Sequence, residues 1–316
     1  MARRRRGRPI DGWIIIDKPA GVTSTHVVNE VRRLLGAAKA GHAGTLDPIA
    51  TGVLPIALGR ATKTIPHLSE RSKSYWFRVR WGEERTTDDI EGEVTAASDQ
   101  RPDEAAIHAA LPRFTGAIDQ VPPAFSAVKV AGERAYDLAR AKEKVELSSR
   151  KVNVHRFELV SVPDADHAEF TVDCGTGTYM RSLARDLARV LGTAGHIAAL
   201  RRLRVGPFDE ASAIALDKLR ALGHIPPPIA PVETVLDDIP ALAVTDAEAN
   251  RLRSGQAIAL LRRADLERLE GLEDGAELCV MAEGRAVALA RRDGATVKPV
   301  RVLNPGHEGV DDVDHR

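Results

Sequence analysis

The order of the expected elements indicates an α+β fold in which a larger part is followed by a small β-rich part. Strand-like and helix-like segments follow one another without the regular alternation that builds a parallel βαβ sheet. A proline-rich stretch at residues 225–229 then precedes short strand-like runs within residues 237–303. The chain has 316 residues, 43% of them hydrophobic and 28% charged, which suits one large domain or two.

Apolar patterning predicts the first elements. Residues 13–16 (Trp-Ile-Ile-Ile) indicate a short buried strand, and residues 18–21 (Lys-Pro-Ala-Gly) indicate a turn. Ser24 or Thr25 can cap a helix that follows, because apolar residues then recur at helical spacing, namely Val27, Val28, Val31, Leu34 and Leu35. The glycine-rich residues 41–54 are expected to follow as a loop.

The middle of the chain is expected to combine strands, a hairpin and helices. Residues 75–81 alternate in polarity and predict a strand with one apolar face, made by Tyr75, Phe77, Val79 and Trp81. The other expected elements are a polar loop or hairpin at 84–104, helices at 103–114 and 179–191, strands at 152–162 and 168–174, and a strand near the arginines of 198–208.

The chain divides into segments of different composition. We expect a basic disordered tail at residues 1–10, a larger domain at 11–230, a small domain at 231–304 and an acidic tail at 305–316. Residues 124–151 are basic with small apolar positions. They suit a mobile insertion that grips a substrate, and they suit an ordinary amphipathic hairpin and helix equally well.

The net charge of zero hides an uneven distribution. Residues 1–230 carry a formal charge of +6, and residues 231–316 carry −6. Polyanion binding depends on local patches, so the neutral total does not exclude a nucleic acid partner. Chance variation on a mixed surface accounts for the asymmetry equally well.

Several protein classes lack their sequence signals here. No apolar run reaches the length of about 18 residues that a membrane span needs, and no secretory signal follows the arginine-rich start. Cys174 and Cys279 lie far apart and indicate two core thiols, which fits a reducing cytoplasm. Gly175-Thr176-Gly177 lacks the third glycine of a dinucleotide loop, and the histidines lack metal-ligand spacing. We therefore expect no cofactor and no metal.

The most distinctive stretch is residues 41–54, GHAGTLDPIATGVL. Gly41 and Gly44 permit backbone angles that other residues avoid, and Pro48 biases Asp47 towards extended geometry. Leu46 can anchor the loop in the core, so Asp47 is projected from a constrained turn. By local physics alone, an Asp before Pro favours an ordinary turn over a nucleophile.

This stretch also carries a family resemblance. Residues 44–48 (GTLDP), with Ala50, Gly52, Val53 and Leu54, resemble the catalytic loop of the TruB family of bacterial tRNA pseudouridine-55 synthases. Other family motifs follow in family order across residues 11–210, and they are residues 17–24 (DKPAGVTS), 73–75 (KSY), 121–129 (VPPAFSAVK), 132–136 (GERAY), 177–183 (GTYMRSL), 200–202 (LRR) and 206–208 (GPF).

The resemblance implies a fold and an activity. The fold is the pseudouridine synthase fold, a mixed, mainly antiparallel central sheet flanked by helices, with a β-rich PUA-like domain at the C-terminus. The activity is the isomerisation of uridine 55 in the tRNA T loop to pseudouridine, which needs no cofactor. The family pattern places the catalytic nucleophile or initiating base at Asp47, its ion-pair partner at Arg181 and a base-stacking residue at Tyr75.

The resemblance also implies the RNA contacts. Tyr179 and Leu200 match residues that line the uracil pocket, and His42 matches a residue that fills the space left by the flipped base. Candidate phosphate contacts are the basic residues Lys18, Arg60, Lys63, Lys129, Arg140, Arg201 and Arg202.

The expected partner is the T stem-loop of tRNA. No membrane and no obligate protein partner are expected, and the protein is expected to be a cytoplasmic monomer. An RNA-binding or tRNA-folding chaperone, and a related synthase that works in a guide-RNA complex, are the alternatives. The presence of Asp47, Tyr75 and Arg181 favours chemistry, and the chain's own insertion and C-terminal domain favour a stand-alone enzyme.

Overall fold

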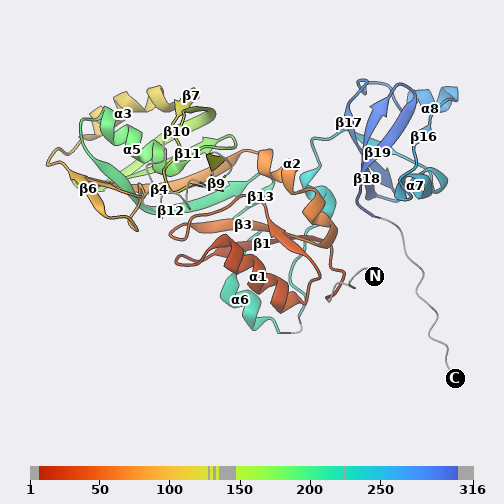
Figure 1. Ribbon diagram of the computed structural model, residues 1–316, viewed down its shortest axis with the longest axis horizontal. Helices are drawn as coiled ribbons and strands as arrows, with labels where there is room; N and C mark the ends of the chain where they lie inside the picture. Colours follow the sequence, from red (N-terminus) through yellow and green to blue (C-terminus); the bar gives the residue numbers. More distant parts are fainter. Residues whose placement is uncertain (1–6, 127–128, 131–132, 135–146, 224, 305–316) are drawn as a thin grey trace.

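The computed structural model describes residues 7–126, 129–130, 133–134, 147–223 and 225–304. It shows a large sheet flanked by helices and a smaller sheet at the C-terminal end of the chain (Figure 1). Arg140, most of the expected N-terminal tail and the acidic tail at 305–316 lie outside the described residues.

The large sheet has 10 strands, most of them in the order β14-β1-β3-β12-β4-β11-β10-β7. β2 pairs with β3, and β13 pairs with β12. The strands are β1 (Gly12–Lys18), β2 (Ala40–His42), β3 (Thr51–Leu58), β4 (Lys73–Trp81), β7 (Gly116–Gln120), β10 (Arg150–Asp164), β11 (His167–Cys174), β12 (Gly195–Val205), β13 (Phe208–Asp209) and β14 (Ile214–Ala215).

Two pairings in this sheet, β1 with β14 and β3 with β12, are parallel. The others are antiparallel. The predicted α+β fold with a mixed, mainly antiparallel sheet is therefore confirmed. Outside the sheet, β5 (Glu83–Arg85) pairs with β6 (Val94–Ala97), and β8 (Lys129–Val130) pairs with β9 (Glu133–Arg134).

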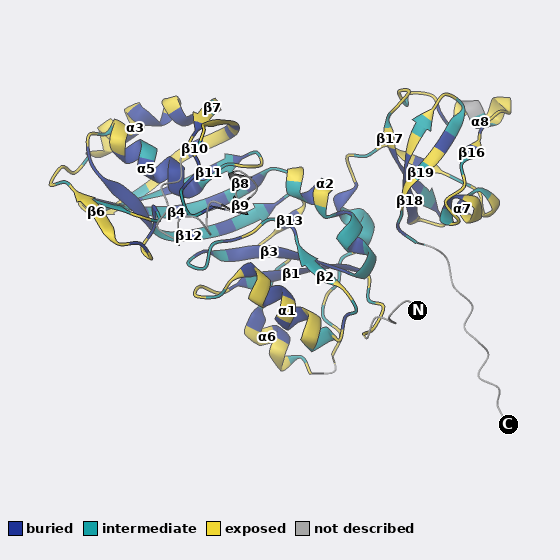
Figure 2. Ribbon diagram, in the orientation of Figure 1, coloured by how far each residue is buried: buried dark blue, intermediate teal, exposed yellow. Residues whose placement is uncertain are grey.

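Helices from distant parts of the chain pack on one hydrophobic core of the large sheet. Val31 of α1, Leu187 of α5 and Phe77 of β4 belong to the same buried cluster. Figure 2 shows buried residues along the sheet and exposed residues on the outer sides of α1 and α3. The helices are α1 (Ser24–Leu35), α2 (Ile65–Glu70), α3 (Glu104–Ala110), α5 (Met180–Val190) and α6 (Leu216–Ala221), with 3-10 turns η1 (Gly59–Lys63), η2 (Leu111–Phe114) and η3 (Val232–Val235).

Strand β4 follows the predicted alternation along its whole length. Tyr75, Phe77, Val79 and Trp81 are buried, and the residues between them are half-buried. Side chains of a strand alternate between the two faces, so these four residues share the face that helix α5 covers. The expected hairpin within 84–104 is also present, as β5 and β6.

Two local expectations were wrong. The hydroxyl of Thr23, rather than Ser24 or Thr25, caps helix α1 by accepting from the backbone N–H of His26. The stretch 41–54 is not a loop throughout, because its ends belong to β2 and β3. Ser24 faces inward and holds Leu46, which leaves Thr23 to cap the helix. The ends of 41–54 are strands because β2 pairs with β3, and β3 pairs with β1.

The C-terminal part has its own sheet of five strands in the order β15-β17-β18-β19-β16. Leu252, Leu278 and Val287 belong to its separate hydrophobic cluster. Its elements are β15 (Ala241–Ala243), α7 (Asp246–Arg253), β16 (Ile258–Ala259), α8 (Arg263–Glu267), β17 (Glu277–Ala282), β18 (Arg285–Asp293) and β19 (Thr296–Val302). Among the described residues, no helix combines the length and the apolar character needed to cross a bilayer.

Candidate active site

Asp47 lies in a loop whose backbone is fixed on both sides. The hydroxyl of Ser24 donates to the carbonyl of Leu46 at 3.0 Å and accepts from the Leu46 N–H at 2.9 Å. On the other side, the Pro48 carbonyl accepts from the Gly21 N–H at 2.9 Å. The Asp47 carbonyl accepts from the N–H of Ala50 at 3.1 Å. The loop therefore presents the Asp47 side chain in one orientation.

Two buried cations complete the support of this loop. The Lys18 ammonium donates to the carbonyls of Pro19, Val22 and Pro48 at 2.8, 2.7 and 3.2 Å. The Arg202 guanidinium donates to the carbonyls of Val53 and Gly44 at 2.8 and 3.1 Å. Lys18 has no exposed surface, and Arg202 is 1% exposed.

These contacts correct the phosphate-contact prediction for Lys18 and Arg202. A phosphate contact needs an accessible cationic group, and both groups are enclosed among backbone carbonyls. Burial lowers the pKa of Lys18 to about 8, against the opposing attraction of Asp47. Both residues therefore hold the loop and are not available to RNA phosphates in this structure.

The Asp47 carboxylate forms an ion pair with Arg181 of helix α5. Nε and Nη2 of Arg181 donate to the two carboxylate oxygens at 2.9 and 3.0 Å, which is the forked geometry that a guanidinium provides. Arg181 is 5% exposed, whereas the Asp47 side chain is 31% exposed. The pair thus combines a buried, fixed cation with a carboxylate that a substrate can reach.

Arg181 is itself held by a shell of acceptors that the sequence analysis missed. It donates to the carbonyls of Thr87 and Phe125 at 3.0 and 2.9 Å. The carboxylate of Asp89, only 2% exposed, lies 3.8 Å from Arg181 Nε. Asp89 belongs to the polar stretch expected to form a loop or hairpin, and its local pattern does not distinguish it from its acidic neighbours.

Tyr75 and Leu200 lie on the neighbouring strands β4 and β12 and belong to the same buried cluster. Arg202 is paired with Tyr75 across these strands. Burial raises the pKa of the Tyr75 phenol, so the phenol keeps its proton at neutral pH. Tyr179 precedes α5, where its backbone exchanges hydrogen bonds with the side-chain amide of Gln120 at 2.8 and 3.1 Å.

His42 ends strand β2, immediately before the Asp47 loop. Its side chain is half-buried, and its Nδ1 has no hydrogen-bond partner among the described residues. Burial and the nearby Arg202 lower the pKa of His42. A neutral imidazole with a free polar atom therefore lies beside the loop.

The remaining predicted basic contacts lie in three settings. Arg201 is paired with Asp17 and Glu210 and is 30% exposed. Arg60 and Lys63 reach the C-terminal part, since Arg60 donates to Asn304 at 3.1 Å and Lys63 to the Val302 carbonyl at 2.5 Å. Lys129 begins β8, but its side chain, like Arg140, lies outside what the structure describes.

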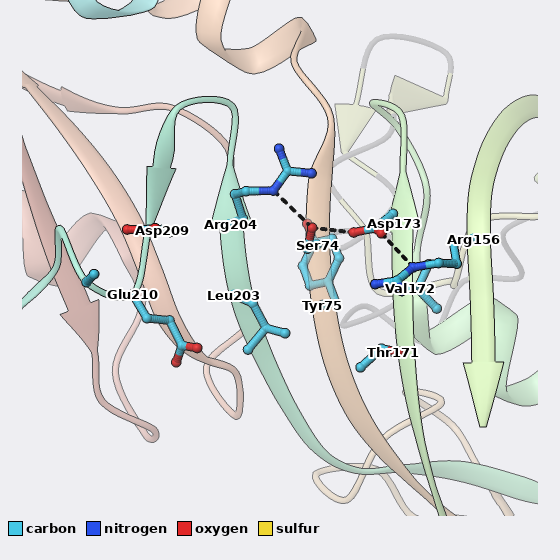
Figure 3. A pocket seen from close by; sticks show the side chains of 11 residues that line it. Ser74, Tyr75, Arg156, Thr171, Val172, Asp173, Leu203, Arg204, Asp209 and Glu210 are labelled. Atoms are coloured by element: carbon cyan, nitrogen blue, oxygen red, sulfur yellow. Dashed lines mark hydrogen bonds and ion pairs between the residues drawn. The ribbon is translucent and has the colours of Figure 1, made fainter. Parts of the chain in front are cut away.

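A pocket of about 370 Å³ opens beside strand β4 (Figure 3). Arg204, Ser74, Asp173 and Arg156 form a hydrogen-bonded chain along it, as the figure shows. Successive side chains of a strand point to opposite faces, and Tyr75 points inward. Ser74 and the side chains bonded to it therefore lie on the other face of the sheet from Tyr75. Its polar groups satisfy one another, and Asp47 does not line it.

Two solved structures share the architecture of this chain over most of its length. A chain of "Crystal structure of the archaeal box H/ACA sRNP Nop10-Cbf5 complex" is 25% identical, with a TM-score of 0.70 over 96% of this chain and 93% of that chain. A chain of "Crystal Structure of a Cbf5-Nop10-Gar1 Complex" is 27% identical, with a TM-score of 0.68 over 93% of this chain and 85% of that one.

Sequence comparison gives a closer match. A tRNA pseudouridine synthase B of Bradyrhizobium diazoefficiens is 54% identical over 95% of this chain and 88% of its own length. That of Rhodospirillum rubrum is 53% identical over 96% of this chain and 100% of its own length. Together with the fold, these matches define a pseudouridylate synthase, which is an isomerase.

Two family signatures locate the match along the chain. Residues 32–180 match "TruB family pseudouridylate synthase (N terminal domain)", and residues 181–237 match "tRNA pseudouridylate synthase B C-terminal domain". The chain belongs to the TruB family, as the sequence motifs predicted. The boundary between the two matches falls between Met180 and Arg181, so Asp47 and Arg181 come from different family regions.

Proposed function

We propose that this protein converts uridine 55 in the T loop of tRNA to pseudouridine, with Asp47 as the carboxylate that acts on the ribose. The names of the curated relatives support tRNA as the substrate. One observation carries the role of Asp47: a reachable carboxylate on a fixed loop is bound through both oxygens by the buried Arg181.

The reaction is an isomerisation, so no atom is gained or lost. The N1–C1′ glycosidic bond breaks, the base turns, and C5 forms a bond to C1′; C5 then loses its proton while N1 gains one. Asp47 begins this sequence at the sugar, as nucleophile or as initiating base. Arg181 orients the carboxylate for that step, because its fork fixes the plane of both oxygens.

The target base must leave its stack to reach Asp47, at a cost of about a few kcal/mol. We assign the binding of the flipped base to Tyr75, Leu200 and Tyr179, which come from β4, β12 and the residue before α5. Tyr75 is neutral at pH 7, and burial raises its pKa further, so it offers a neutral aromatic face for stacking. We assign His42 to the space that the base leaves in the T loop.

The remaining expectations concern partners and organisation. The segment 124–151, the PUA-like role of the C-terminal domain, the monomeric state and the cytoplasmic location stay predictions. The similar solved structures are complexes with partner proteins. The higher identity to tRNA pseudouridine synthase B relatives favours tRNA over a guide-RNA complex.

The proposal is tested by mapping the product in a minimal substrate. Purified protein is incubated with an unmodified T-arm stem-loop, and pseudouridine is located by carbodiimide labelling and primer extension. We expect one modified position, uridine 55, and no product in the matched stem-loop that carries cytidine there. Modification at another position, or none at all, would overturn the assigned substrate site.

A further inference from the structure

A second buried arginine–aspartate pair lies one helical turn beyond Arg181. Nη1 of Arg185 is 3.0 Å from a carboxylate oxygen of Asp88, and both side chains are 9% exposed. Residues four apart lie on the same side of a helix, so α5 directs Arg181 and Arg185 towards the same neighbouring segments. The proposed reaction gives a role to Arg181 and none to Arg185.

Asp88 lies in the segment that holds Arg181. Thr87 before it supplies a carbonyl to Arg181, and Asp89 after it supplies a carboxylate. Asp88 has a φ of 59°, in the left-handed region that few residues other than glycine, Asn and Asp adopt. Its carbonyl accepts from the N–H of Ile197 at 3.0 Å, which ties the segment to β12.

Arg185 connects this segment to a second one. Its Nη2 donates to the carbonyl of Val121 at 2.9 Å, a group that also accepts from Ser182. Phe125, four residues further on, supplies the other carbonyl that holds Arg181. One guanidinium therefore fixes both segments from which the backbone acceptors of Arg181 come.

The pair contains a carboxylate whose burial is unfavourable. Burial raises the pKa of Asp88 to about 6, against the attraction of Arg185 and Arg181 and with the repulsion of Glu84. Asp186 lies on the other side of Arg185, with an oxygen 2.9 Å from Nε. A buried ion pair of this kind is weak evidence for stability, and in some proteins such pairs serve to fix position.

We propose that Asp88 and Arg185 are positioning residues, which hold the segments around Thr87 and Phe125 so that Arg181 presents Asp47 in its reactive orientation. This inference rests on the proposed function of Asp47. Neither residue touches the substrate; each acts through Arg181. Loss of the pair loosens the acceptors of Arg181 and slows the step at the sugar without weakening RNA binding.

The test compares variants under single-turnover conditions. Asp88→Asn keeps the shape and tolerates the left-handed backbone, and Arg185→Lys keeps the charge but loses the fork. We expect both to lower the rate of pseudouridine formation by about 10- to 100-fold, with the Kd for the T-arm unchanged. Arg189→Met is the matched control, since Arg189 lies a further turn along α5 and pairs with Glu84 instead. It should keep the wild-type rate.

The pH dependence separates positioning from a merely structural role. The wild-type rate should fall as pH drops through about 6 and Asp88 takes up its proton, whereas Asp88→Asn should lack this step. The rate of the wild type divided by the rate of Asp88→Asn should therefore decrease towards acidic pH. A rate of Asp88→Asn and Arg185→Lys equal to the wild type, or a ratio constant with pH, would overturn the inference. Inactivity of the wild-type protein would instead contradict the proposed function.

Discussion

At the scale of single residues, buried cations in the site donate hydrogen bonds to carbonyls and carboxylates of the protein itself. The forked contact from Arg181 satisfies both oxygens of Asp47. Lys18 lies nearby with its ammonium among three carbonyls. From sequence alone such residues are expected at the surface, because Lys and Arg are rarely fully buried unless paired.

The buried Lys18 leads to a prediction about pH. Its pKa is about 8 in the folded protein and 10.5 in an ordinary environment, so the unfolded chain binds more protons between these values. The unfolding free energy of the wild type should therefore rise relative to Lys18→Met as pH increases from 8 to 10.5. Between about pH 7.5 and about pH 9.5 the gain should approach about 2 kcal/mol.

Urea denaturation of both proteins at the two pH values measures this difference. Lys73, whose pKa burial also lowers to about 8, is present in both proteins and cancels. A difference between wild type and variant that does not change with pH would show that the folded environment leaves the Lys18 proton affinity unaltered.

At the scale of elements, the strands of the large sheet join distant segments at the Asp47 loop. Gly52 of β3 lies against Arg202 of β12, and a Cβ at Gly52 would lie 2.2 Å from the Arg202 carbonyl oxygen. The φ of Gly52 is also positive, at 97°. The glycine of this motif is therefore required by the close approach of two backbones.

Much of the local structure follows from the sequence, and the reasons are physical. The alternation of apolar residues in β4 and their helical spacing in α1 predict which side chains are buried. The repeat of the element determines which residues share a face. By contrast, Arg181 as the partner of Asp47, and Tyr75 as a site residue, were predicted from the motif resemblance. Asp88 and Asp89 were missed, because an acidic residue in a polar hairpin looks solvated until α5, about 90 residues away in the sequence, is packed against it.

At the scale of the whole molecule, basic residues from both parts of the chain gather at the junction between them. Burial and the nearby Arg60, Lys39 and Arg301 lower the pKa of Lys63. Arg301 also donates to the Lys63 carbonyl at 3.4 Å. Lys39 and Arg301 are exposed at this junction, and we predict that they contact an RNA backbone.

This surface gives a prediction about salt. The double variant Lys39→Glu/Arg301→Glu should bind tRNA more weakly, and the slope of log K against log salt concentration should decrease by about one unit per lost phosphate contact. The matched control is Arg262→Glu/Arg263→Glu, which makes the same charge change at exposed positions around the start of α8. An equal loss of affinity in both double variants would indicate a general charge effect and contradict a specific surface.

The central claim is that Asp47 performs the chemistry, and one measurement tests it most directly. Pseudouridine formation is followed under single-turnover conditions with wild type and Asp47→Asn, and the Kd for the T-arm is measured in parallel. We expect the variant to lose at least about a thousandfold in rate while its Kd stays within about twofold of the wild type. Pseudouridine formation by Asp47→Asn at the wild-type rate would contradict the account.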